Sequence, residues 1–151
     1  MSQSLVHNSM HLIWSTKGRT PWLKDKAIRE RLHSYLAGIA QQMECLPYQI
    51  GGVEDHVHVY CSLSKNIALK ELVMNLKKES SKWIKKEYQQ LGDFSWQSGY
   101  GGFSISYSHG KVLRSYIINQ EEHHATISFQ DEFREICKKN QVKIDEQYVW
   151  D

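Results

Sequence analysis

The chain has 151 residues, of which 40% are hydrophobic and 24% are charged, and its formal net charge is +2. These values are typical of a soluble globular protein, and we expect one domain over residues 1–151. No apolar run approaches the ~20 residues of a membrane span, and the N-terminus lacks the layout of a signal peptide. Three scattered cysteines indicate reduced thiols. We therefore expect a cytoplasmic protein with no membrane partner.

The first half of the chain predicts the order strand, helix, strand, strand. Residues 5–15 form a strand-like run. Asp25 is placed to cap a helix whose apolar side chains recur at helical spacing. A short strand is expected over residues 48–50, and Gly51-Gly52 is expected to turn the chain into a strand over residues 55–62.

The second half predicts a helix, a strand and two further helices. The helix from about Ala68 to Tyr88 has one apolar face and one face rich in lysine. Residues 91–102 resemble a loop, and residues 103–107 alternate as a strand. A helix capped by Ser108 is expected from Lys111 to about His124.

Two signals mark the C-terminal end of the chain. Ser128 with Asp131 resembles a loose capping box before the last helix. The tail from Gln141 onward is expected to be irregular and docked through Tyr148 or Trp150.

This order is the split β-α-β pattern, which predicts an α+β fold of the ferredoxin-like or RRM-like type. Helices would cover one face of an antiparallel sheet, and a C-terminal helix would carry Tyr116. Val57 and Val59 would face the helices, while His56 and His58 would face the open side. In RNA-recognition modules the open face of the sheet meets nucleic acid.

The motif His56-Val57-His58 is the strongest chemical signal in the sequence. Alternate residues of a strand point to the same face, so both imidazoles leave the sheet side by side. Imidazole is the commonest metal ligand among side chains, and two of them make half of a coordination site. The alternative is a pair of solvent-facing or hydrogen-bonded histidines.

Tyr116 and Gln120 form a second group, four residues apart on a predicted helix. A phenol facing a metal held by two histidines is suited to attack phosphorus. The amide oxygen of Gln120 can complete a shell for Mg²⁺ or Mn²⁺. The alternatives are a core or interface tyrosine and a surface amide.

Neighbouring polar residues are weaker candidates. Tyr60 shares the face of the two histidines but projects parallel to them, which makes it a poorer nucleophile than Tyr116. Asp55 is expected to make a turn contact, although it can also orient an imidazole. His123 and His124 point in different directions on a helix, and we expect caps or surface contacts there.

Lysines gather in residues 65–88 and acidic residues in residues 119–135. This uneven distribution suggests a polarised surface that could bind along an anionic chain such as a nucleic-acid backbone. Solvated helix faces are the simpler explanation of this pattern. If DNA does bind, phosphate contacts are expected from the lysine-rich helix and a basic loop: Lys77, Lys78, Lys82, Lys85 and Arg19.

Together these segments resemble a known family. His56-Val57-His58 matches the His-hydrophobic-His (HUH) motif of single-strand DNA endonucleases. Residues 99–106, followed by residues 116–124, are similar to the small single-tyrosine HUH transposases of bacterial and archaeal insertion sequences, which move as single-stranded DNA. Residues 76–81 resemble that family's basic helix, with a departure at Lys78-Glu79. The resemblance covers about residues 5–140.

The resemblance implies a metal-dependent enzyme that cleaves and rejoins single-stranded DNA at the ends of an insertion sequence. His56, His58 and Gln120 would bind Mg²⁺ or Mn²⁺. Tyr116 would form a 5′-phosphotyrosine and release a 3′-OH. Members of the family recognise hairpins near the element ends. They act as homodimers, in which the histidines of one subunit meet the tyrosine helix of the other.

Three other interpretations stay open. A non-catalytic nucleic-acid-binding module of the same fold needs neither the histidine pair nor Tyr116. A small hydrolase that uses water as its nucleophile needs the metal site but not Tyr116. A domesticated family member with host duties would keep the whole site. For a homodimer, residues 5–14 or 103–107 are the strands expected to pair at a sheet edge.

Overall fold

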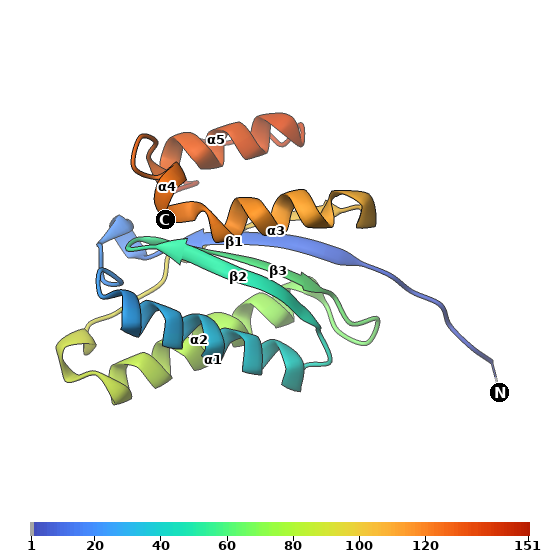
Figure 1. Cartoon of the computed structure of the whole chain (residues 1–151), viewed down its shortest axis with the longest axis horizontal. Helices are drawn as coiled ribbons and strands as arrows, with labels where there is room; N and C mark the ends of the chain where they lie inside the picture. Colours follow the sequence, from blue (N-terminus) through green and yellow to red (C-terminus); the bar gives the residue numbers. More distant parts are fainter. Residues whose placement is uncertain (1) are drawn as a thin grey trace.

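The computed structural model describes residues 2–151, in which an antiparallel sheet lies between two layers of helices (Figure 1). The elements are β1 (Ser9–Ser15), α1 (Lys26–Gln42), β2 (Pro47–Val53), β3 (His56–Ser62), α2 (Leu69–Glu87), β4 (Gly101–Ile105), α3 (Gly110–Ile118), α4 (Gln120–His123) and α5 (Phe129–Lys139). The strand order β2-β3-β1-β4 is that of the split β-α-β arrangement. The predicted α+β fold class is therefore confirmed.

β1 and β3 form the centre of the sheet. They pair along their whole length, with Ile13 opposite His58 and Ser15 opposite His56. β2 and β4 are the edge strands. The expectation that residues 5–14 pair at an edge is therefore wrong, because β1 already has a neighbour on each side. The strand predicted over residues 103–107, observed as β4, does lie at an edge.

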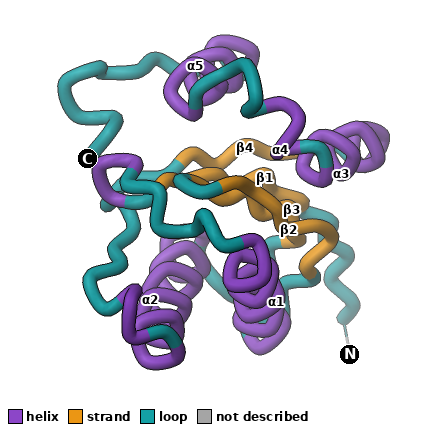
Figure 2. Tube along the Cα trace, turned by 60° about the vertical axis from the view of Figure 1, so that its left-hand side comes forward, coloured by secondary structure: helices purple, strands orange, loops and turns teal. Residues whose placement is uncertain are grey.

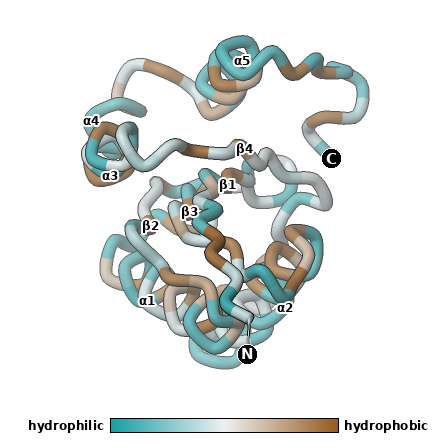
Figure 3. The backbone as a smooth tube through the Cα atoms, turned by 90° about the vertical axis from the view of Figure 1, so that its right-hand side faces the viewer, coloured by the Kyte–Doolittle hydropathy of each residue, from teal (hydrophilic) through white to brown (hydrophobic). Residues whose placement is uncertain are grey.

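α1 and α2 cover one face of the sheet and enclose the main apolar core (Figure 2). Val57 and Val59 are fully buried on this face, as predicted. Asp25 caps α1 by accepting a hydrogen bond from the backbone N–H of Ile28. Figure 3 shows hydrophobic segments along the strands, between the two helical layers. Full burial of one such aliphatic side chain contributes ~1.5–3 kcal/mol.

The other face of the sheet is covered as well. α3 lies over β2 and β3, and α5 lies above the sheet beside α3 (Figures 1 and 2). The side chains of His56 and His58 are 0% exposed as a result. The expectation that helices cover only one face and that His56 and His58 are exposed on the other is therefore wrong. Alternation in the sequence indicates which face a side chain takes, but not whether a later segment packs there.

A glycine pair sits where α3 meets the sheet. Gly51 and Gly52 were expected to form a turn, but both lie inside β2, and the chain turns at Glu54 and Asp55. A Cβ atom on Gly51 would lie 2.7 Å from the carbonyl oxygen of Ile117. Glycine at this position therefore allows the α3 backbone to approach the strand closely.

The predicted helix from Lys111 to His124 is divided in two. It begins at Gly110 without a side-chain cap from Ser108 and ends at Ile118. Asn119 has non-helical backbone angles, and the short helix α4 follows it. This break changes the direction of the chain just before Gln120.

The C-terminal segment is held by a helix cap and by contacts of Trp150. Ser128 caps α5 by accepting a hydrogen bond from the N–H of Asp131, as predicted. Trp150 packs edge-on against the rings of Phe129 and Phe133, so docking through Trp150 is confirmed. The side chain of Arg19 donates to the Trp150 carbonyl at 2.9 Å.

The three cysteines are free thiols, and all three are buried. Burial raises the pKa of Cys61 to about 12. Within residues 2–151, each helix is too short or too polar to cross a membrane.

Candidate active site

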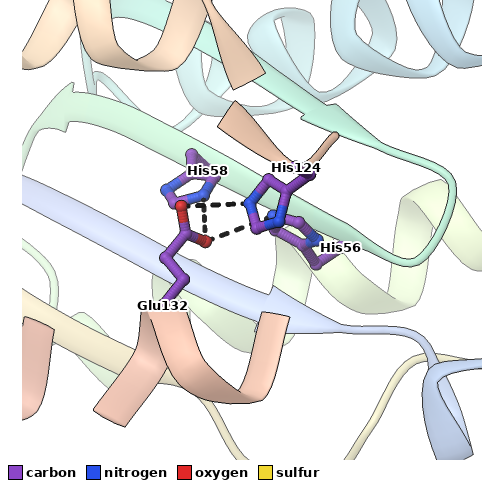
Figure 4. A group of neighbouring side chains, drawn as sticks. All are labelled: His56, His58, His124 and Glu132. Carbon is purple, nitrogen blue, oxygen red and sulfur yellow. Dashed lines mark hydrogen bonds and ion pairs between the residues drawn. The ribbon is translucent and has the colours of Figure 1, made fainter. Parts of the chain in front are cut away.

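Four side chains converge between β3 and the helices that cover it (Figure 4). His56 and His58 come from β3, His124 follows α4, and Glu132 lies near the start of α5. Oε1 of Glu132 lies 3.0 Å from Nε2 of His58 and 3.3 Å from Nε2 of His56. Its Oε2 lies 3.1 Å from Nε2 of His124. The carboxylate is thus at the centre of three imidazoles.

The two histidines of β3 each have a partner on the ring nitrogen that points away from Glu132. Nδ1 of His56 lies 2.7 Å from the carboxylate of Asp55. Nδ1 of His58 lies 2.8 Å from Nε2 of His11 on β1, and these two rings are stacked. When Nδ1 of each ring carries the proton, both Nε2 atoms keep a lone pair directed at the centre of the site.

Gln120 and His124 extend the ring of polar atoms. Oε1 of Gln120 lies 3.0 Å from Nε2 of His56, and its amide nitrogen donates to Glu132 at 3.1 Å. Nδ1 of His124 donates to the carbonyl of Ile127 at 2.7 Å, so its Nε2 faces the centre. The three ligands predicted from the sequence therefore lie together, and His124 and Glu132 join them.

The charges of these groups are strongly coupled. Burial acts to lower the pKa of His56, but hydrogen bonds with Asp55 and Glu132 outweigh it and raise the pKa to about 9. Burial lowers the pKa of His58 in spite of Glu132. Burial also opposes ionisation of Glu132, yet its contacts with the three imidazoles hold its pKa well below the usual range. A buried carboxylate of this kind needs a nearby positive charge, either a proton on an imidazole or a bound cation.

Tyr116 borders the same cluster. Its hydroxyl donates a hydrogen bond to Glu132 and lies 3.3 Å from Nε2 of His123. Its ring centroid is 5.8 Å from that of His58. Burial, followed by the charge of Glu132, raises the pKa of Tyr116 above its ordinary value. One chain thus brings the histidines and the tyrosine together.

The donor atoms fit a divalent cation. Imidazole nitrogens with carboxylate and amide oxygens are ordinary ligands of such ions, and their ligand atoms are close enough to share one. A set that includes three imidazoles suits Mn²⁺ or Zn²⁺ better than Mg²⁺, which prefers oxygen.

Sequence reasoning missed two of these residues and misplaced a third. Glu132 falls on the apolar face of α5 beside Phe129 and Phe133. Acidic side chains are seldom buried without a partner, so its position in the sequence pattern is a sign of a functional role. His11 lies on the same face of β1 as Ile13, so the alternation of β1 also indicates a histidine on a buried face. His124 was expected to make a cap or a surface contact. It bonds the Ile127 carbonyl, but its side chain is 7% exposed, so the surface alternative is wrong.

The lysines predicted to contact DNA lie on α2, across the sheet from Tyr116. Lys78, Lys82 and Lys85 are exposed. The ammonium group of Lys77 donates to three successive carbonyls of residues 97–99, and burial lowers its pKa to about 8. Arg19 is held by the Trp150 carbonyl. Lys77 and Arg19 therefore have partners within the chain.

A comparison with protein families matches residues 4–120 to a model described as "Transposase IS200 like". The chain belongs to this family of IS200-like transposases. The matched residues include both histidines of β3, Tyr116 and Gln120. Residues 121–151, with His124 and Glu132, lie beyond the matched segment. Members of a transposase family cleave and join DNA, so the chain belongs to a class of DNA-cleaving and DNA-joining enzymes.

Two solved structures resemble this IS200-like transposase. A candidate transposase from Deinococcus radiodurans is 23% identical, with a TM-score of 0.63 over 80% of this chain and 96% of that one. A REP-associated tyrosine transposase bound to a REP hairpin is 11% identical, with a TM-score of 0.59 over 84% of this chain and 76% of that one. At these identities the likeness shows the fold alone. A search of curated proteins gave no match.

Proposed function

We propose that this transposase cleaves and rejoins single-stranded DNA through a 5′-phosphotyrosine on Tyr116. The observation that carries the proposal is the position of the Tyr116 hydroxyl, which is hydrogen-bonded to the carboxylate at the centre of the histidine cluster. A phenol beside a cation site is suited to attack a phosphodiester. One structural neighbour is bound to a DNA hairpin, and we propose a hairpin near the cleavage site as the recognition element here too.

The chemical step needs only a few groups. The Tyr116 oxygen forms a bond to phosphorus, and the bond from phosphorus to the 3′ oxygen breaks. The phenol gives its proton to Glu132, which is placed to accept it, and the departing 3′ oxygen takes a proton from solvent. Rejoining is the reverse reaction, in which a 3′-OH attacks the phosphotyrosine.

Of the two predicted cations, Mg²⁺ and Mn²⁺, Mn²⁺ suits His56, His58 and Gln120 better because it accepts imidazole ligands more readily, and Glu132 and His124 would add further ligands. A cation bound there supplies charge that polarises the phosphate and offsets its developing negative charge. Asp55 orients the His56 ring in this arrangement. Of the lysines on α2, Lys78, Lys82 and Lys85 are the ones that we propose as phosphate contacts, because they are exposed.

The first test replaces the nucleophile. With single-stranded DNA that carries the hairpin flanking its own gene, Tyr116→Phe should lose covalent adduct and cleavage while binding the DNA normally. Tyr148→Phe, at an exposed tyrosine outside the site, should keep both activities. Peptide mapping should place the wild-type adduct on Tyr116. Retained cleavage would favour the water-using hydrolase, and binding without any cleavage by wild type would favour the non-catalytic module.

A second test concerns assembly. The homodimer with shared sites stays a prediction. The proximity of Tyr116 to His58 and Glu132 within one chain supports the alternative, cleavage within a subunit. Inactive Tyr116→Phe mixed with an inactive His56→Ala, His58→Ala variant should then stay inactive. Recovery of cleavage in mixed dimers would instead show that the sites are shared between subunits.

A further inference from the structure

We propose that an aromatic cavity at the N-terminal end of α3 binds one unpaired base of the DNA strand that Tyr116 cleaves. This inference rests on the proposed function and adds to it a site for the nucleotides next to the reacting phosphate. The cavity has a volume of about 390 Å³, within the range of small-ligand sites. Its lining comes from four parts of the chain: His7, Tyr48, Tyr60, Tyr107, Ser108, Gly110, Lys111 and Arg114.

Aromatic rings dominate the wall of this cavity. The rings of Tyr48 and Tyr60 lie 4.8 Å apart and are tilted by 48°. Tyr107 stands at the rim with 83% of its surface exposed, next to the ring of His7 at 6.0 Å. An exposed tyrosine above an aromatic floor is the arrangement on which single-stranded nucleic acids stack their bases, whatever the base.

The cavity lies beside the candidate active site on the same face of the sheet. His56, His58 and Tyr60 are alternate residues of β3, so Tyr60 is ~6.6 Å along the strand from His58. α3 spans both places. Its first residue, Gly110, is so close to Tyr60 that an added Cβ atom would lie 2.5 Å from the phenol oxygen. A strand with its phosphate at Tyr116 can therefore place a neighbouring base in the cavity.

The charges around the cavity suit an anionic chain. Lys111 and Arg114 line it, and both are exposed on α3. Its lining contains no carboxylate, whereas the cavity between α1 and α3 includes Glu30 and Glu121. Stacking surfaces and cations together favour a nucleotide over an uncharged apolar ligand.

The test compares two DNA probes that differ only in their bases. Fluorescence anisotropy would measure the affinity of labelled oligo(dT) and of an abasic oligonucleotide of the same length, in the Tyr116→Phe background so that no strand is cut. Tyr107→Ala should weaken oligo(dT) binding about 5- to 100-fold and leave abasic binding unchanged, because it removes a stacking surface. Tyr107 is so exposed that the fold should tolerate this change.

Charge variants give an independent readout. Lys111→Gln should weaken both probes and lower the slope of log affinity against log salt by about 0.7, the value for one phosphate contact on a single strand. The matched controls are Tyr148→Ala and Lys138→Gln, at exposed positions outside the cavity, and they should change neither measurement.

The outcomes separate this inference from the proposed chemistry. The base site would be overturned if Tyr107→Ala bound oligo(dT) as tightly as the Tyr116→Phe protein does. It would also be overturned if Tyr107→Ala lost the same affinity for both probes. Either result would hold even if Tyr116 forms its adduct in the wild-type protein. Loss of base-dependent binding in Tyr107→Ala, together with a wild-type protein that forms no adduct with DNA, would support the cavity and reject the phosphotyrosine proposal.

Discussion

Residues 4–120, which match the family, and the C-terminal segment beyond them build the same site in different ways. The first segment contributes side chains from paired strands and from α3, including His56, His58 and Tyr116. The second contributes Glu132, which reaches the centre of the site from a helix laid over it. The matched segment thus arranges the side chains that we propose as metal ligands and as the nucleophile. The added segment sets the charge at the centre and buries it.

The two segments are joined by a small apolar cluster of their own. Phe129, Phe133 and Cys137 of α5 pack against Ile13 and Phe103 of the sheet. This cluster is separate from the main core under α1 and α2. Its position explains how Glu132 is brought within reach of the histidines, because the same face of α5 carries the phenylalanines and the carboxylate.

The sharpest test of this comparison is the carboxylate itself. Glu132→Gln should lower Mn²⁺ affinity about 10- to 100-fold, because it removes the negative charge among the three imidazoles. Isothermal titration calorimetry would measure the change. Glu135→Gln, an exposed acid on the same helix, is the matched control and should bind Mn²⁺ like wild type. Unchanged affinity in Glu132→Gln would mean that metal binding does not depend on the carboxylate that α5 contributes.

A second prediction concerns the first segment. His11 stays neutral because burial lowers its pKa to about 3, so its Nε2 can accept the proton on Nδ1 of His58. His11→Phe keeps the stacked ring but removes that acceptor, and Mn²⁺ affinity should fall about 10-fold. His11→Gln, whose amide oxygen can take the place of Nε2, should restore most of the affinity. If the two variants bind Mn²⁺ equally well, His11 acts only through packing.

The last prediction concerns stability. Gly51→Ala should lower the free energy of unfolding by ~1–3 kcal/mol, because the new methyl group meets the α3 backbone at Ile117. Gly38→Ala in α1, where a Cβ atom meets nothing within 4 Å, should instead raise it by ~0.5–1 kcal/mol. Denaturant unfolding of both variants gives the comparison. A neutral Gly51→Ala would show that α3 shifts without cost.

The sequence allowed the fold class and the matched half of the site to be predicted, because both depend on local patterns. Alternation in β3 indicates that His56 and His58 share a face, and helical spacing relates Tyr116 to Gln120. The role of Glu132 could not be predicted in the same way. Its place depends on the break at Asn119 and on how α5 packs, and neither follows from periodicity.

Two positions depend on segments distant in the sequence. The glycines at 51 and 52 were predicted to form a turn, since glycine is common in turns, but they lie inside β2, where Gly51 makes room for a helix. Lys77 was predicted as a DNA contact because it lies on a basic helix face, and that prediction is untested. Its ammonium group donates to the carbonyls of residues 97–99, a contact that periodicity does not predict.

The burial of all three thiols has a practical consequence for following α5 in solution. Because Cys45, Cys61 and Cys137 are shielded from solvent, thiol-reactive dyes should attach almost only to cysteines that are introduced at the surface. Val112→Cys on α3 and Lys139→Cys on α5 would place one dye on each helix, at exposed positions. Energy transfer between the dyes would then report whether α5, the helix that carries Glu132, moves away from α3 when DNA binds.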